Sequence, residues 1–134
     1  MVSRLKARGN AGFTLLEMMI VMIIMGILLS IALPIYTQSV VRAREAVLRN
    51  DLFELRKLIS QYTLDKQKAP QSLDDLVQAG YLKEIPKDPM THEANWEPKM
   101  EDVLLTVDQQ DPGIDDVHSA STQMSSDGTA YNTW

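Results

Sequence analysis

Residues 12–34 read GFTLLEMMIVMIIMGILLSIALP, and this stretch decides the architecture of the chain. From Phe13 to Leu33 the sequence runs for 21 positions with a single charged residue, Glu17. A helix of that length reaches roughly 32 Å, enough to cross a hydrocarbon layer of about 30 Å. We therefore predict a helix over residues 13–34 that spans a membrane.

The flanking residues predict the orientation of this helix. Three of the first eight residues are basic, whereas residues 88–134 hold ten acidic residues and one basic residue. The positive-inside rule then places the start of the chain in the cytoplasm and its end outside. A secretory signal peptide carries small residues after its apolar region, but here Ala11 and Gly12 come before it. Any processing would therefore leave the apolar segment on the mature protein.

The composition excludes several classes of function. The chain has 134 residues, a net charge of -5 and no cysteine, which excludes disulfide scaffolds, thiolate zinc sites and cysteine nucleophiles. The acidic balance argues against binding to nucleic acid. His92 and His118 stand far apart, and the sequence has neither a Gly-x-Ser-x-Gly nucleophile motif nor a Gly-rich phosphate loop. We predict a structural protein and not an enzyme.

After the apolar segment the pattern becomes amphipathic. Pro34 lacks an amide donor, so we expect it to kink or locally melt the helix. Beyond it, one stripe of apolar residues recurs at helical spacing: Val41, Leu48, Leu52, Leu55, Ile59 and Tyr62. This predicts one helix from about residue 13 to 64 whose outer half packs on the chain's own head. A coiled coil is the alternative partner for the same stripe.

The residues after this helix predict a small α+β head. Ala69 before Pro70 disfavours further helix, and Ser72 to Asp75 resembles a capping box that starts a short helix ending at Gly80. Val103 to Val107 is the clearest strand, with a weaker candidate at residues 95–97. From residue 108 onward turn-forming residues dominate, and the pattern does not favour regular structure there.

The order of residues at the start of the apolar helix resembles the class III leader of type IV pilins and type II secretion pseudopilins. In that family a basic leader ends in glycine, a prepilin peptidase cuts after it, and the new first residue is N-methylated. The resemblance implies cleavage between Gly12 and Phe13, methylation of Phe13, and Glu17 as the fifth mature residue. Pro34 falls where the family has its helix-bending proline.

The head carries a second part of the resemblance. Pro70, the short helix ending at Gly80, Tyr81-Leu82 and residues 86–89 (PKDP) are similar to the head of the major pseudopilin of type II secretion. This implies a pilin-like fold with a long N-terminal helix packed on a small antiparallel sheet. Ala69 departs from the aromatic or polar residue usual in that family, and Met90-Thr91 replace an aromatic-Gly pair.

The resemblance also implies calcium, because major pseudopilins bind it through an acidic C-terminal loop. The candidate ligands are Asp115 and Asp116 together with Asp111 or Asp127, and Pro112-Gly113 offer a turn. Calcium takes six to eight oxygens from a loop bent around it. The alternative is a solvated acidic loop, and no other cofactor is expected.

These observations divide the chain into residues 1–12 (a cleaved leader), 13–34 (a membrane and filament-core helix) and 35–134 (an amphipathic stem and a periplasmic head). The function that the resemblance implies is a subunit of a short periplasmic filament of type II secretion. Its implied partners are further copies of itself, the prepilin peptidase and methyltransferase, an inner-membrane assembly platform with its ATPase, and minor pseudopilins. A type IV pilin of a surface pilus is the alternative, and a single-span enzyme or binding protein is a more distant one.

Overall fold

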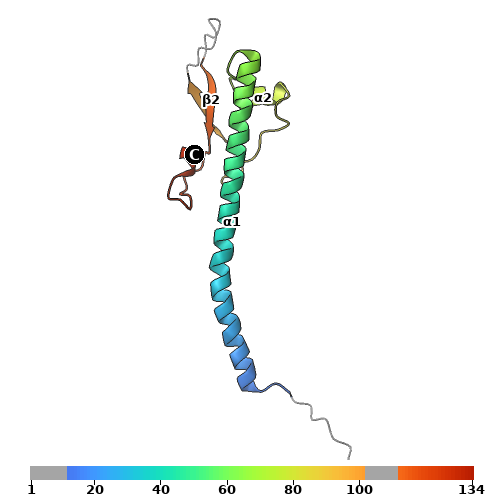
Figure 1. The fold of residues 1–134 in the computed structure, drawn as a ribbon, viewed down its shortest axis with the longest axis vertical. Helices are drawn as coiled ribbons and strands as arrows, with labels where there is room; N and C mark the ends of the chain where they lie inside the picture. Colours follow the sequence, from blue (N-terminus) through green and yellow to red (C-terminus); the bar gives the residue numbers. More distant parts are fainter. Residues whose placement is uncertain (1–11, 102–111) are drawn as a thin grey trace, which may run out of the picture. The chain divides into compact units, whose positions relative to one another are not determined.

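The computed structural model describes residues 12–101 and 112–134. Its chain divides into two compact units, Met1–Gln38 and Ser39–Trp134. The elements in order are α1 (Leu15–Lys66), α2 (Leu73–Gln78), β1 (Glu97–Glu101), β2 (Gly113–His118) and the 3-10 turn η1 (Tyr131–Thr133) (Figure 1). The long N-terminal helix and the small antiparallel sheet confirm the predicted α+β, pilin-like class.

Helix α1 begins at Leu15 because Thr14 caps it. The Thr14 hydroxyl accepts a hydrogen bond from the Glu17 amide at 3.1 Å, and the Thr14 carbonyl accepts one from the Met18 amide at 3.1 Å. Such a cap satisfies amide donors that a helix terminus leaves without intrahelical partners. The helix thus starts two residues later than the expected residue 13.

Pro34 lies inside α1, and the helix runs through it without a break. The local melting that we considered at Pro34 is therefore not observed. A proline has no amide hydrogen, so the carbonyl of Ser30, four residues earlier, lacks its usual helical donor. Nearby hydroxyls bond to other carbonyls, from Ser30 to Ile27 at 2.7 Å and from Thr37 to Pro34 at 3.0 Å.

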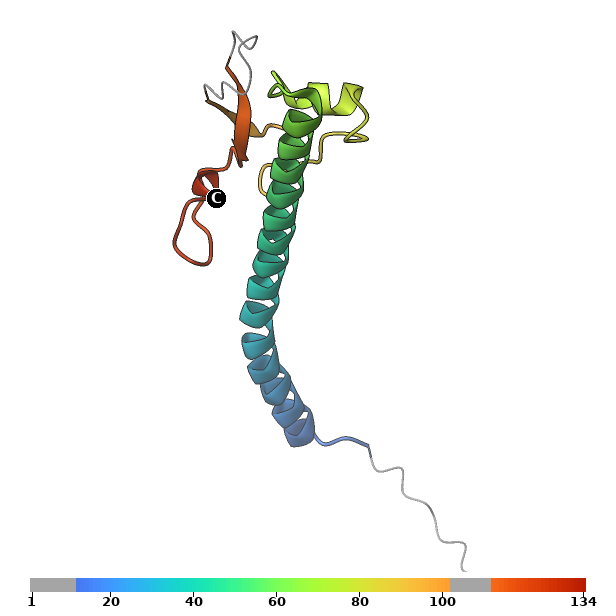
Figure 2. The same cartoon turned by 45° about the horizontal axis from the view of Figure 1, so that its top comes forward.

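In the second unit, α1 contributes one face to the core. Its buried residues are Glu45, Leu48, Leu52, Leu55, Ile59 and Tyr62. The sheet and the chain after it lie along one side of this part of the helix, as both views show (Figure 2). Packing on the chain's own head is therefore confirmed. Val41 was expected in the stripe but is 41% exposed, because no part of the head covers it in the described core.

Helix α2 forms as its end signals predict. The Asp75 carboxylate accepts hydrogen bonds from the amides of Gln71 at 2.8 Å and Ser72 at 3.1 Å, which closes the first turn. Gly80 stops the helix with a φ of 82°, a left-handed conformation that glycine adopts without strain. Leu73 and Leu76 are buried against α1 residues of the core.

The sheet differs from its prediction. Strands β1 and β2 pair antiparallel, with Glu97 opposite His118 and a register shift between Lys99 and Met100. The expected strand at residues 103–107 lies outside the described residues, whereas β2 occupies a region for which we predicted no regular structure. That expectation was wrong because Ile114 and Val117 are fully buried, and core packing stabilises a strand that the local turn propensity disfavours.

Gly113 allows β2 to approach the end of α1. A side chain at this position would place its Cβ only 2.3 Å from the Cβ of Ala69. The next amide, from Ile114, donates a 2.8 Å hydrogen bond to the carbonyl of Pro70. The close contact therefore depends on two small residues: Ala69, which departs from the family pattern, occupies the space that a side chain at position 113 would need. Gly113 serves this close contact as a strand residue and not as the turn that we expected.

The close contact between Gly113 and Ala69 leads to a prediction about stability. Gly113→Ala should destabilise the head by about 1–3 kcal/mol, because the added methyl group overlaps with Ala69. Thermal denaturation of the full chain in detergent measures the loss. The double variant Gly113→Ala with Ala69→Gly restores the space and should recover part of it. Equal losses in the single and double variants would contradict this account of the contact.

Candidate functional site

The predicted processing site lies at the start of the first unit. Gly12 precedes the helix, and a Cβ placed on it would meet no atom within 4 Å. Phe13 follows with 77% of its surface exposed. Cleavage between these residues and methylation of Phe13 stay predictions. The open surroundings indicate that a side chain at position 12 would not disturb the described fold.

Glu17 lies in the first turn of α1, where its negative charge is favoured by the helix dipole. Its amide is bonded to the Thr14 hydroxyl, but its carboxylate has no hydrogen bond or ion pair within residues 12–101 and 112–134. Among the charged residues, it stands alone in the apolar segment. Its role in assembly stays a prediction.

The apolar side chains at the start of α1 are not covered by other parts of the described chain. Every large apolar side chain from Phe13 to Ile35 is exposed, by 43–87%. An 18-residue window of this helix reaches a mean hydropathy of 2.7, with none of it buried. By length and composition the helix is able to cross a membrane. An apolar surface this extensive requires lipid or other protein around it.

In the second unit, charged groups of α1 hold the C-terminal segment (residues 119–134). Glu45 is only 6% exposed, which is unusual for a charged side chain. Its carboxylate accepts hydrogen bonds from the Ser126 amide at 2.7 Å, the Ser126 hydroxyl at 2.6 Å and the Tyr131 hydroxyl at 2.9 Å. These three bonds compensate the loss of water around a buried carboxylate.

The surroundings of Glu45 also change its acidity. Burial raises the pKa of Glu45. The hydrogen bonds from Ser126 and Tyr131 and the charge of Arg49 together lower it by more, so the pKa lies below its ordinary value. Burial raises the pKa of Tyr131, and its hydrogen bond to the Glu45 carboxylate raises it further. Glu45 is therefore ionised in the folded head at neutral pH.

Arg56 is the second connection between α1 and the rest of the head. Its Nε donates to Asp116 Oδ1 at 2.5 Å, and its Nη2 donates to the backbone oxygens of Val117 at 3.0 Å and Trp134 at 2.7 Å. His118 approaches the same carboxylate, with Nε2 3.4 Å from Oδ2. Burial raises the pKa of Asp116, but the hydrogen bonds from Val117 and Arg56 and the positive charges lower it more.

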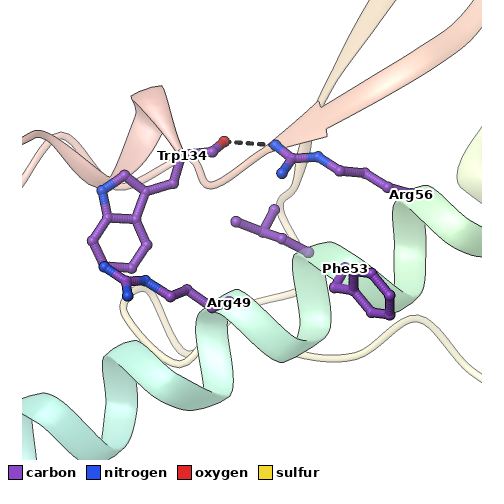
Figure 3. Close-up of a pocket in the computed structure, with 5 residues that line it drawn as sticks. Arg49, Phe53, Arg56 and Trp134 are labelled. Carbon is purple, nitrogen blue, oxygen red and sulfur yellow. Dashed lines mark hydrogen bonds between the residues drawn. The ribbon is translucent and has the colours of Figure 1, made fainter.

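Arg49 is the third connection. Its guanidinium bonds to Asp127 Oδ2 at 2.8 Å and stacks on Trp134, with Cζ 4.4 Å from the ring centroid. Figure 3 shows the Arg49 guanidinium against the Trp134 ring and Arg56 hydrogen-bonded to the Trp134 backbone oxygen. Together with Phe53, these residues line a pocket of about 380 Å³. Phe53 is 64% exposed at its edge.

The structure separates the predicted calcium ligands. Asp111 lies outside the described residues, and Asp115 is exposed. Asp116 and Asp127 bond to two different arginines. Among the described residues no group of three or more His, Cys, Asp or Glu side chains could hold a metal ion. The described part of the acidic set therefore does not fit the expected ligand cage.

Asp88, in the PKDP motif, has a structural role that the sequence analysis did not predict. It is fully buried, accepts a hydrogen bond from the Ser119 hydroxyl, and accepts another from the Met90 amide at 2.8 Å. This carboxylate fixes the loop before β1 to the start of the C-terminal segment. Burial and the charge of Asp88 also raise the pKa of nearby Asp51. The PKDP pattern was recognised, but nothing in it pointed to Ser119.

Comparisons with known proteins address both units. The model of the prokaryotic N-terminal methylation motif matches residues 7–33. Type II secretion system core protein G of Aeromonas hydrophila is 33% identical, covering 63% of this chain and 71% of that protein. The chain belongs to the core protein G family. The core protein G of Vibrio cholerae is 34% identical, over 63% of this chain and 68% of its own.

Membership of the core protein G family identifies this chain as a pseudopilin subunit, and its relatives in that family are structural components. Its apolar helix fits a protein anchored in the inner membrane. Competence protein ComGC of Halalkalibacterium halodurans is also similar, 38% identical over 54% of this chain and 72% of its own. No solved structure matches the chain.

The lowered pKa of Glu45 predicts a pH-dependent contribution to stability. Because its folded pKa lies below the ordinary value of 4.5, this stability is fully present above that pH and is lost as the pH falls through the folded pKa. Glu45→Gln should therefore cost about 1–3 kcal/mol at neutral pH. Thermal melts at several pH values should show this difference shrinking in acid. A difference independent of pH would contradict the role of the ionised carboxylate.

Proposed function

We propose that this chain is the filament-forming subunit of a type II secretion system. A prepilin peptidase cuts between Gly12 and Phe13, and the amine of Phe13 is methylated. The chain then sits in the inner membrane with the start of its helix in the cytoplasm and its head in the periplasm. Subunits leave the membrane and assemble into a short periplasmic filament that drives protein export. The match of the methylation motif to residues 7–33 and membership of the core protein G family support this proposal.

The observation that carries the assembly step is the exposed apolar helix. Side chains are exposed on all its faces from Phe13 to Ile35, so a single membrane-facing stripe does not describe it. A helix that is apolar all round is suited to complete burial, first in lipid and then among identical helices. Methionine side chains at residues 18, 19, 22 and 25 are unbranched and adapt to either surrounding.

Glu17 supplies the register in this proposal. After cleavage the Phe13 amine is a cation four residues before Glu17, and a neighbouring copy presents the same pair at similar depth. In a medium of low dielectric the two charges attract far more strongly than in water. Each is costly without its partner, so the pair selects one alignment of the helices more than it adds net stability. The unpartnered carboxylate of Glu17 within the described chain supports this role.

Pro34 has a mechanical role in the same proposal. Pro34 has no amide hydrogen to donate to the carbonyl of Ser30, so the helix is weakened at this point without being interrupted. Subunits that move from bilayer to filament need such a point, where α1 adjusts its curvature. The partners in this process are the peptidase and methyltransferase, the inner-membrane platform with its ATPase, and the minor pseudopilins.

The similarity to a competence protein favours a second candidate function. In that case the same assembly would build a surface type IV pilus for adhesion, motility or DNA uptake. Electron microscopy of intact cells separates the two, because a surface pilus extends beyond the cell and a secretion pseudopilus does not.

Two substitutions test the proposal. Gly12→Ala should remain unprocessed, since a side chain at the cleavage position obstructs the peptidase, while the open surroundings of Gly12 leave the fold intact. Glu17→Ala should be processed but should not assemble. Mass spectrometry of the mature chain measures processing, and filaments sheared from cells measure assembly.

The matched control is Glu54→Ala, which removes an exposed glutamate of α1 outside the apolar segment. It should be processed and assemble like the parent. Normal filaments from both Gly12→Ala and Glu17→Ala would overturn the proposed function.

A further inference from the structure

The charged residues that α1 turns toward the end of the chain have a regular order. Glu45, Arg49 and Arg56 are separated by four and seven residues, so they follow one face of the helix. Glu45 meets three hydrogen-bond donors, and the two arginines meet an aspartate each. Each of these three side chains therefore meets partners in β2 or the C-terminal segment: hydrogen-bond donors for Glu45, and carboxylates for the two arginines.

Arg56 gathers acceptors as a bound cation would. One guanidinium reaches the carboxylate of Asp116 and the backbone oxygens of Val117 and Trp134, all within 3.0 Å. These three acceptors come from a strand and from a residue 16 positions beyond its end. A planar guanidinium with five N–H donors is suited to join such separated oxygens. His118 adds a further bond to the same Trp134 oxygen.

Arg49 neutralises the second acid and fixes an aromatic ring. It bonds to Asp127 while its plane lies against Trp134, whose indole donates to the Thr129 hydroxyl at 2.8 Å. The loop around Asp127 is closed by the Ser125 amide bonding to the Thr129 carbonyl at 2.7 Å and by Gly128 at a φ of 80°. Its shape is therefore held by the chain's own bonds.

These contacts leave the described acidic residues without an arrangement that could bind a calcium ion. Calcium requires six to eight oxygens directed at one point. Asp116 and Asp127 are directed at two different guanidinium groups, and Asp115 is exposed. An ion at either carboxylate would face the positive charge of an arginine at close range, which is repulsive. The positions are already occupied by cations of the chain.

We propose that Arg49 and Arg56 replace a metal ion in this head, so that the C-terminal segment docks on α1 without calcium. Asp116 and Asp127, two of the candidate calcium ligands, then serve as partners of stem arginines. The stability of such a head does not depend on the calcium concentration of its compartment. This inference stands apart from the filament proposal, because it concerns the folding of the head alone.

The first experiment uses the unmodified full chain in detergent micelles. Its thermal midpoint is measured by circular dichroism with millimolar calcium and with an excess of chelator. An ion present at one hundred times its dissociation constant would raise the midpoint by about 10 °C or more. We expect a change below about 1 °C, far smaller than the shift that a stabilising ion would cause. A chelator that lowers the midpoint by several degrees overturns the proposal.

The second experiment tests the arginines themselves. Arg56→Gln should lower the midpoint by about 5–10 °C, because it removes one ion pair and leaves two backbone oxygens without their donor. Arg56→Lys keeps the charge, but a single nitrogen does not span the three acceptors, so its loss should be intermediate. Arg42→Gln is the matched control, since Arg42 lies on α1 near Arg49 and has no hydrogen bond or ion pair in the part of the chain that the structure describes.

Limited proteolysis provides a readout that does not require the variants to melt cooperatively. Protease cleavage within the C-terminal segment should be faster in Arg56→Gln and in Arg49→Gln than in the parent and in Arg42→Gln. The rate in the parent should be the same with calcium and with chelator. Equal rates for Arg56→Gln and Arg42→Gln, or protection of the parent by calcium, contradict the replacement of the ion.

Discussion

The head of this protein is built on one buried face of α1. Leu48, Leu55 and Ile59 lie at its centre with at most 2% of their surface exposed, and the short helix and the sheet both pack on them. A head of this size with no cysteine has little apolar surface and no disulfide to stabilise it. The same face therefore continues with charged residues that bind the end of the chain. Apolar burial and ionic contacts are two parts of one interface.

The charged part of that interface is well suited to a small head. An ion pair that is partly exposed to solvent adds little stability by itself, because water screens its charges. Here the carboxylate of Glu45 has three donors and the guanidinium of Arg56 has three acceptors, so few polar atoms are left without a partner. Such a network specifies where the C-terminal segment lies, since any other position would leave its members unsatisfied.

The sequence analysis was most accurate for local features. The capping residues of α2, the stop at Gly80 and most of the apolar stripe are determined by residues close in sequence, and each was found where predicted. The burial of Glu45 was not predicted, because the stripe was traced through apolar residues alone, although its position three residues before Leu48 puts Glu45 on the buried face. Strand β2 was missed because turn-forming residues surround Ile114 and Val117, and their burial depends on α1.

By itself the sequence determined the leader motif, the apolar helix with its single acid, and the class of the fold, because these depend on order and spacing along the chain. Only the tertiary structure decided which arginine meets which aspartate, that Asp88 bonds to Ser119, and that Gly113 makes room for Ala69. The residues joined by these hydrogen bonds lie 31 to 78 positions apart in the sequence, and no local pattern encodes such pairs. Asp116 and Asp127, which resembled metal ligands in the sequence, are partners of stem arginines because the fold brings cationic side chains of α1 next to them.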